Sequence, residues 1–155
     1  MQNLIPASCL GLLSMGAPAF ADLAHFEWAF SEGCMQNILE FEKAPSMFEE
    51  GGWYGGKTTG AGDYKFHADG TTVFLYEKGP QQQQTCTVTD QIVSKQEAEW
   101  ILELELNEQF PLHWEKTTST QHQSLWSAFN ADTTTIFTLG LDPKGGAILS
   151  YEVQK

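Results

Sequence analysis

Arginine is absent from the chain, and all eight basic side chains are lysines. Twenty aspartates and glutamates outnumber these lysines, so the formal net charge at pH 7 is −12. Nucleic-acid binding depends on Lys and Arg side chains that neutralise phosphates, and we therefore do not expect this chain to bind nucleic acid. The absence of guanidinium groups also argues against bidentate capture of phosphate or carboxylate ligands. A basic protein partner is compatible with this charge, although acidity commonly serves solubility alone.

Charged side chains are also absent from the start of the chain, where the first one is Asp22. An apolar stretch over residues 4–16 is followed by Pro18 and by Ala19-Phe20-Ala21. An apolar segment that ends with small residues at the −3 and −1 positions is typical of a signal peptide. We therefore predict a signal peptide over residues 1–21, although no Lys or Arg precedes its apolar stretch.

Three alternatives to a cleaved leader are less favoured. As a retained membrane anchor, the stretch would only just reach the length of about 17 residues that a spanning helix needs. A lipoprotein signal at Cys9 would need a larger aliphatic residue where Pro6 stands. A buried N-terminal helix is disfavoured because the uncharged stretch ends in Ala-x-Ala and is followed directly by charged residues. Cleavage would leave residues 22–155 as a single domain without a stable membrane anchor, located in the periplasm or secreted.

Only two cysteines, Cys34 and Cys86, follow the predicted leader. In an oxidising compartment these two can form one intramolecular bridge, which we favour over two buried free thiols. Closing the loop of about 50 residues between Cys34 and Cys86 stabilises a fold by about 4 kcal/mol on the chain-entropy model. A zinc site is not expected, because there is no C-x-x-C pair and no His at ligand spacing from either cysteine.

The remaining pattern predicts an α+β domain. A helix is expected over Leu23–Lys43, where apolar residues recur at helical spacing, and a capping box at Ser94 and Glu97 opens a second helix that ends near Glu108. Strands are expected over residues 64–67, 72–77, 85–89, 121–129, 133–141 and 147–153, with a possible short one over 112–116. This order, αβββ-αβββ, predicts an antiparallel sheet of about six strands with two main helices on one face.

Residues 51–58, Gly-Gly-Trp-Tyr-Gly-Gly-Lys-Thr, match the phosphate-binding pattern G-x-x-x-x-G-K-[ST]. The context argues against a nucleotide site, because a helical turn precedes the glycines and residues 59–62 cannot begin a firm helix. We therefore expect either that Trp53 fills the core or that Trp53, Tyr54 and Lys57 form a loop that binds a ligand or partner. No cofactor is predicted.

Histidine offers little support for catalysis or metal binding. Both H-x-E sequences lack the P-C-x-x-C that zinc deaminases need, and neither H-E-x-x-H nor G-x-S-x-G occurs. No metal site is predicted. One alternative function nevertheless stays open, a small exported hydrolase or metal-dependent enzyme in which His67, His113 or His122 meets carboxylates in the fold.

The second helix is the most acidic segment, with glutamates at positions 97, 99, 103, 105 and 108. They form either a solvated face or a docking surface for a basic partner. Trp100 lies off the apolar stripe of this helix, which makes it a candidate contact residue or part of a second buried face. We therefore favour a non-enzymatic binding or accessory protein of the cell envelope. A carrier of a small apolar ligand is a further alternative that requires a large apolar cavity.

Overall fold

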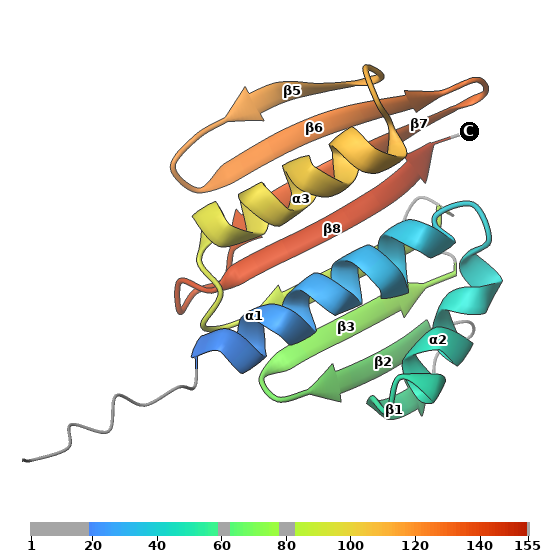
Figure 1. The fold of residues 1–155 in the computed structure, drawn as a ribbon, viewed down its shortest axis with the longest axis vertical. Coiled ribbons are helices and arrows are strands. Elements are labelled where there is room, and N and C mark those ends of the chain that lie inside the picture. Colours follow the sequence, from blue (N-terminus) through green and yellow to red (C-terminus); the bar gives the residue numbers. More distant parts are fainter. Residues whose placement is uncertain (1–18, 59–62, 78–82, 155) are drawn as a thin grey trace, which may run out of the picture.

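The computed structural model describes residues 19–58, 63–77 and 83–154. These residues form one antiparallel sheet of eight strands in the order β1-β2-β3-β4-β8-β7-β6-β5, together with three α-helices (Figure 1). The strands are β1 (Tyr54–Lys57), β2 (Asp63–Ala68), β3 (Thr71–Tyr76), β4 (Thr85–Asp90), β5 (Trp114–Ser119), β6 (Gln123–Asn130), β7 (Thr133–Leu141) and β8 (Ala147–Gln154). The α-helices are α1 (Ala19–Trp28), α2 (Ala44–Glu50) and α3 (Lys95–Gln109).

The sheet consists of two four-stranded meanders, β1–β4 and β5–β8, joined in the middle of the sheet by β4 and β8. This central pair runs antiparallel, with Cys86 opposite Tyr151 and Val88 opposite Leu149. A helical segment precedes each meander along the chain. The molecule therefore has two halves built on a similar plan, residues 19–90 and residues 94–154.

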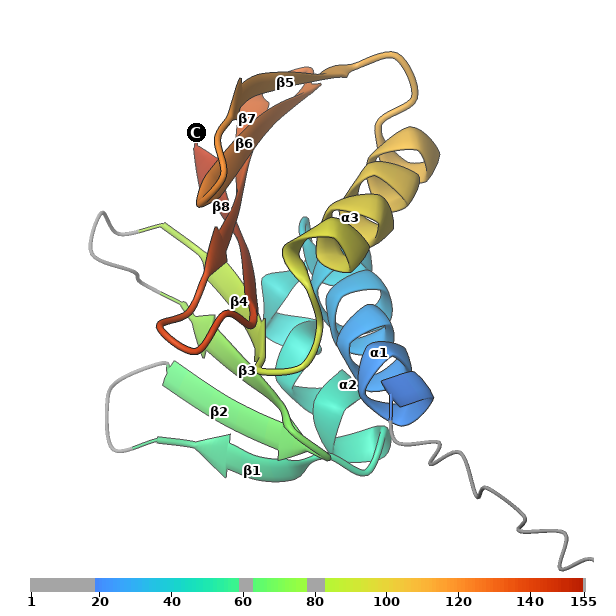
Figure 2. The ribbon, with the colours of Figure 1, turned by 90° about the vertical axis from the view of Figure 1, so that its left-hand side faces the viewer.

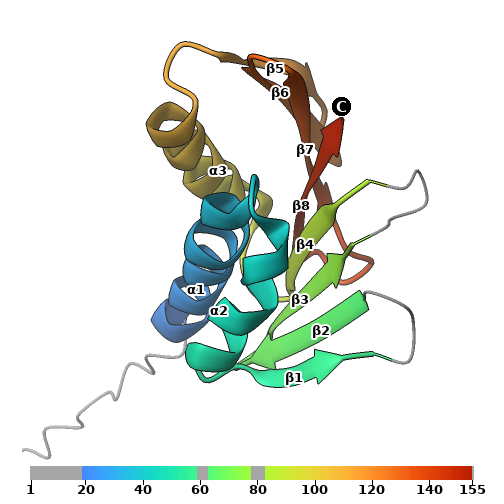
Figure 3. The same ribbon diagram turned by 90° about the vertical axis from the view of Figure 1, so that its right-hand side faces the viewer.

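All the helices lie on one face of the strongly twisted sheet (Figures 2 and 3). In the first half α1 packs near β3 and β4, and in the second half α3 packs near β7 and β8. Residues alternate along each strand between this covered face and the opposite one. On β3, for example, Val73 and Leu75 are buried beneath the helices, whereas Phe74 and Tyr76 are half-buried on the uncovered face.

The chain passes from the first half to the second at Asp90, which is buried at the end of β4. Its carboxylate accepts hydrogen bonds from the Thr71 hydroxyl at 2.7 Å and from the backbone N–H groups of Ile92 and Val93 at 2.8 and 3.2 Å. Gly146 passes so close that a Cβ there would lie 2.2 Å from the Asp90 carbonyl oxygen. These contacts fix the turn that leads into α3.

The six-stranded sheet with two main helices in the order αβββ-αβββ was a wrong prediction. The sheet has eight strands and the described residues are mostly β, because β1 and β5 extend it at its two edges. Residues of β1 were expected to be a glycine-rich loop, yet Gly55 and Gly56 pair with β2. A side chain at Gly55 could not approach this closely, since its Cβ would lie 2.0 Å from the Lys65 carbonyl oxygen.

The continuous first helix over Leu23–Lys43 was also a wrong prediction. After α1 the chain widens into a π-helix (Ala29–Cys34), continues as a 3₁₀ turn (Met35–Asn37), breaks, and then forms a second 3₁₀ turn (Phe41–Lys43) before α2. Two contacts accompany this change of geometry. The Asn37 side chain donates hydrogen bonds to the backbone carbonyls of Glu32 and Gly33 at 3.1 and 3.2 Å, so it competes with regular helical bonding. The Phe48 ring from α2 occupies the space that a side chain at Gly33 would fill.

The predicted Cys34–Cys86 disulfide is confirmed, with Cα atoms 6.0 Å apart. It joins the π-helix to β4 and so fastens the helical layer to the centre of the sheet. The Tyr151 hydroxyl donates a hydrogen bond to the Cys34 carbonyl oxygen at 3.4 Å. Burial raises the pKa of this tyrosine well above its usual range, so it stays protonated as a donor.

Most of the predicted leader lies outside the described residues, which begin at Ala19. Its last three residues, Ala19-Phe20-Ala21, belong to α1. Among the helices of the described residues, none has the length and apolar character needed to span a membrane.

Candidate functional site

Helix α3 begins at the predicted capping box. The Ser94 hydroxyl accepts a hydrogen bond from the backbone N–H of Glu97 at 3.2 Å, and the Glu97 carboxylate accepts one from the backbone N–H of Ser94 at 2.8 Å. The hydrogen bonds from Ser94 to this carboxylate lower the pKa of Glu97, which keeps it charged at the positive end of the helix. The inner face of α3 is buried against the sheet through Ala98, Ile101, Leu102 and Leu106.

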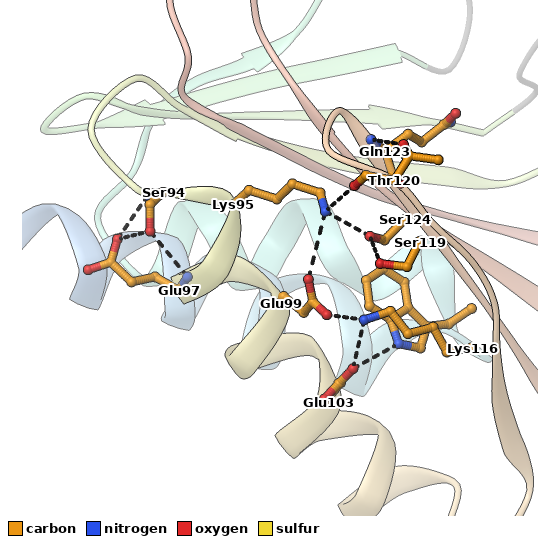
Figure 4. A network of polar contacts seen from close by, with 11 residues as sticks. Ser94, Lys95, Glu97, Glu99, Glu103, Lys116, Ser119, Thr120, Gln123 and Ser124 are labelled. Carbon is orange, nitrogen blue, oxygen red and sulfur yellow. Dashed lines mark hydrogen bonds and ion pairs between the residues drawn. The ribbon is translucent and has the colours of Figure 1, made fainter.

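One flank of α3 is fastened to β5 and β6 by the polar network drawn in Figure 4. Lys116 of β5 forms ion pairs with Glu99 and Glu103, and it lies over the ring of Trp126 at 4.8 Å. The indole N–H of Trp126 donates to the Glu103 carboxylate at 3.2 Å. Burial disfavours the charge on Lys116, but its hydrogen bond to Glu99 and the two negative charges raise its pKa above the ordinary value. Glu99 and Glu103 are therefore engaged within the protein.

Lys95 completes this network from the start of α3. Its ammonium donates hydrogen bonds to the Ser124 hydroxyl at 2.8 Å and to the Thr120 carbonyl oxygen at 3.1 Å, and it lies 3.8 Å from the Glu99 carboxylate. A Ser–Lys contact of this kind serves as a nucleophile and base in some hydrolases. Ser124, however, is 0% exposed, so no substrate carbonyl can reach it from the surface. The contact holds the helix to the sheet.

The opposite, outward side of α3 carries an apolar pair between two acids. Trp100 and Leu104, one helical turn apart, are 61% and 47% exposed. Glu97 precedes this pair by three residues and Glu108 follows it by four, and both are exposed. We call these four residues the α3 outer stripe. The only lysine of α3, Lys95, points toward β6 and does not neutralise the stripe.

Further acids border the stripe on the side of α1. The half-buried Glu105 is influenced electrostatically by Glu108 on its own helix and by Glu27 and Glu32 of the first helical segment. Burial raises the pKa of Glu105, the nearby Ser31 hydroxyl opposes this shift, and the three negative charges add to it. Glutamates from two helices therefore approach one another here, and their mutual repulsion favours a cation at this place.

The three residues of the predicted binding loop do not share one surface. Trp53 is buried in an aromatic cluster, stacked 5.8 Å from Trp28 and edge-on to Phe48 at 5.3 Å. Tyr54 and Lys57 are exposed on the edge strand β1, where the Tyr54 ring lies 5.9 Å from that of His67. The segment that matches the phosphate-binding pattern thus forms a turn and a strand, with Lys57 paired to Tyr64.

The histidines of the enzyme hypothesis lie on separate parts of the molecule. His67 is on β2, near one edge of the sheet, whereas His113 and His122 precede and follow β5 at the other edge. All three are exposed. In the part of the chain that the structure describes, no three His, Cys, Asp or Glu side chains are placed to hold a metal ion. The convergence that this hypothesis requires is therefore not found among these residues.

Hollows lined by described residues open near the C-terminal end of α3. One of about 200 Å³ is lined by Phe110, Pro111, His113 and Phe129, together with Gln109 and Asn130. A smaller one of about 80 Å³ adjoins it, between Ile38 and Leu39 on one side and Phe110, Asn130 and Thr133 on the other. Both are surface features, and the core between the helices and the sheet is filled by buried aromatic and aliphatic side chains. They do not provide the large interior cavity that a carrier of an apolar ligand needs.

Leu112, beside these hollows, was predicted to begin a possible strand over residues 112–116, but it lies in the turn before β5, which starts at Trp114. The Phe110-Pro111-Leu112-His113 turn is closed by a hydrogen bond from the His113 N–H to the Phe110 carbonyl oxygen at 3.0 Å. Leu112 has φ 67°, a conformation that this kind of turn usually reserves for Gly or Asn and that costs another residue roughly 1–2 kcal/mol. Its side chain is 98% exposed. The sequence signal for this turn was Pro111, directly after Phe110.

Comparisons with protein-family models, with curated proteins and with solved structures found no match. Two surfaces of this chain stand out among the described residues. One is the acidic and aromatic α3 outer stripe, and the other is the apolar end of α3 around Leu112.

Proposed function

We propose that this chain is a non-enzymatic binding or accessory protein that works in the periplasm or as a secreted protein. Through the α3 outer stripe it binds a basic, amphipathic segment of a protein partner. The observation that carries this proposal is the exposed pair of Trp100 and Leu104 with Glu97 and Glu108 at its two ends.

The chemistry of the stripe supports a partner that is both apolar and cationic. Exposed tryptophans often supply most of the binding energy when they become buried in an interface, and Leu104 extends the apolar contact by one helical turn. Carboxylates at the margin attract Lys and Arg side chains and set the orientation of the partner. Glu105 adds to this attraction, because a cation beside it would offset the repulsion from Glu27, Glu32 and Glu108.

Two features support a location outside the cytoplasm. Disulfides such as Cys34–Cys86 form and persist mainly in oxidising compartments. The sequence also begins with a predicted leader. If this part of the proposal is right, the chain expressed in full is recovered in an exported form, and its mass matches a protein that starts at Asp22. Recovery of only the full-length, reduced chain in the cytoplasm would contradict it.

The binding proposal can be tested with a defined probe, a helical peptide composed of Lys and Leu with the leucines along one face. Isothermal titration calorimetry against the oxidised protein should detect binding that weakens as the salt concentration rises. The substitution Trp100→Ala removes the central side chain of the stripe. It should weaken binding of the peptide by about 30-fold, the effect expected for the loss of a hot-spot residue.

A matched control separates the stripe from the general negative charge of the molecule. The double variant Glu97→Gln with Glu108→Gln removes two carboxylates from the stripe, and Glu49→Gln with Glu50→Gln removes two exposed carboxylates from α2. Only the first pair should weaken binding of the peptide strongly. Equal weakening by both pairs, or unchanged binding by Trp100→Ala, would show non-specific attraction and overturn the proposal.

A further inference from the structure

A second surface, at the C-terminal end of α3, has a different character from the stripe. Leu39, Leu112 and Phe129 are exposed here, around the half-buried Phe110. We call these four residues the end patch. They come from three places in the chain, the turn before α2, the turn after α3 and the end of β6, and the two adjoining hollows lie among them.

The end patch contains a projecting side chain directly beside a recess. Leu112 is held outward in its left-handed conformation, 98% exposed. The two residues before it, Phe110 and Pro111, and the one after it, His113, line the larger hollow. The turn is fixed on both sides, by the His113 N–H bonded to Phe110 and by the Phe129 N–H bonded to the His113 carbonyl oxygen at 2.8 Å. A projection and a recess placed side by side are what a two-fold interface between identical surfaces requires.

The charge distribution indicates what covers this patch. Neither hollow is lined by any Asp, Glu or Lys, whereas the open depression that continues over the β6–β7 turn includes a carboxylate, Asp132. The whole chain has a net charge of −12, so two copies repel each other across most of their surface. The two hollows of the end patch therefore offer a second copy a surface without carboxylates.

We infer that the end patch is the interface of a two-fold homodimer. In this dimer Leu112 of each copy enters the hollow between Phe110 and Phe129 of the other. The contact buries the exposed leucines and aromatic rings on both sides and gives the left-handed conformation of Leu112 a role. The α3 outer stripe takes no part in it.

Sedimentation velocity over a concentration series tests this inference on the oxidised protein. The wild-type chain should dimerise reversibly as the concentration rises. Leu112→Gly removes the projecting side chain and also relieves the backbone, because glycine accepts a positive φ without cost. This variant should remain monomeric, and its melting temperature, measured on dilute monomer, should equal or exceed that of the dilute wild type. A role in folding alone would instead lower it.

Two further results decide the outcome. Phe129→Ser, which alters the recess, should weaken dimerisation as Leu112→Gly does. Trp100→Ala on the stripe should leave dimerisation unchanged. The inference is overturned if the wild type stays monomeric up to about 1 mM. It is equally overturned if Leu112→Gly dimerises like the wild type, whatever the peptide titrations show for the stripe.

Discussion

The two halves of the molecule share a plan, but different kinds of contact hold the helices to the sheet in each half. In residues 19–90 the helical segments are fixed by aromatic packing around Phe48, which stacks on Phe66 at 5.2 Å, and by the Cys34–Cys86 disulfide. In residues 94–154 a regular helix, α3, is fixed along one flank by the ion pairs of Lys95 and Lys116. A similar layer of helix on a meander can thus be stabilised by apolar and covalent contacts or by charges.

This difference explains why the candidate surface lies on α3. In the first half Trp28 and Trp53 stack against each other, with Trp53 buried and Trp28 half-buried. In the second half Glu99 and Glu103 pair with the lysines of the network, whereas Glu97 and Glu108 stay exposed on the outward side of α3. Both halves contribute to one core, and the exposed acidic and aromatic surface lies in the second half.

The largest expected effect concerns the covalent contact of the first half. Replacing both cysteines, Cys34→Ala with Cys86→Ala, should lower the free energy of unfolding by about 4 kcal/mol, since the bridge closes a loop across 52 positions. Urea unfolding of this variant and of the oxidised wild type measures the difference. A loss below about 1 kcal/mol would mean that aromatic packing alone holds the first half.

A smaller effect is expected in the ion network of the second half. Lys95→Met should cost about 1–2 kcal/mol, because the buried Ser124 hydroxyl loses its closest hydrogen-bond donor. The matched control is Lys43→Met in the first half, where the pair of Lys43 and Glu40 is exposed to solvent and its loss should not change the free energy of unfolding measurably. If urea unfolding shows that Lys95→Met and Lys43→Met lower the free energy of unfolding equally, the distinction between the two halves is wrong.

The smallest effect concerns pH and the acidic side of α3. Since the pKa of Glu105 is raised in the folded protein, the fold binds this proton more tightly than the unfolded chain does, and stability falls as the pH rises through the folded pKa. Glu105→Gln removes this penalty, so it should be more stable than the wild type at pH 7 and equal to it below about pH 4, under the ordinary value of 4.5. Thermal unfolding across this range checks it, and a stability gain that does not depend on pH would contradict it.

The elements that sequence analysis placed well are those in which local signals agree. β7 extends over the predicted residues 133–141, where Thr135, Phe137 and Leu139 alternate into the core. α3 begins at the predicted capping box and ends one residue after the predicted Glu108. The disulfide could be predicted because only one pairing was available outside the leader.

The failures arise where distant contacts override local preference. Glycine has little tendency to form strands, and only the pairing with β2 makes Gly55 and Gly56 part of the sheet. Apolar spacing continues from Phe30 to Ile38 and Phe41, all of them buried, so it gave no sign that the helix changes geometry and breaks after Asn37. The exposure of Leu112 could not be read from its residue type.

For the candidate surface, the sequence supplied the residues but not their orientation. The spacing of apolar residues along α3 left Trp100 either exposed to solvent or on a second buried face, and in the structure it is exposed. The five glutamates of α3 looked equivalent, whereas Glu99 and Glu103 face Lys116, and Glu105 faces the acids of the first helical segment. These partners lie far from α3 in the sequence, and only the fold brings them to it.

Hydrogen-exchange mass spectrometry with the Lys/Leu peptide tests most directly whether α3 is the recognition surface. Bound peptide should slow exchange in residues 95–109, with a weaker effect in residues 27–32 of the adjoining helix. Exchange in β1–β3 of the first half should be unchanged. Protection confined to β1–β3 or to the uncovered face of the sheet, with α3 unaffected, would contradict the account.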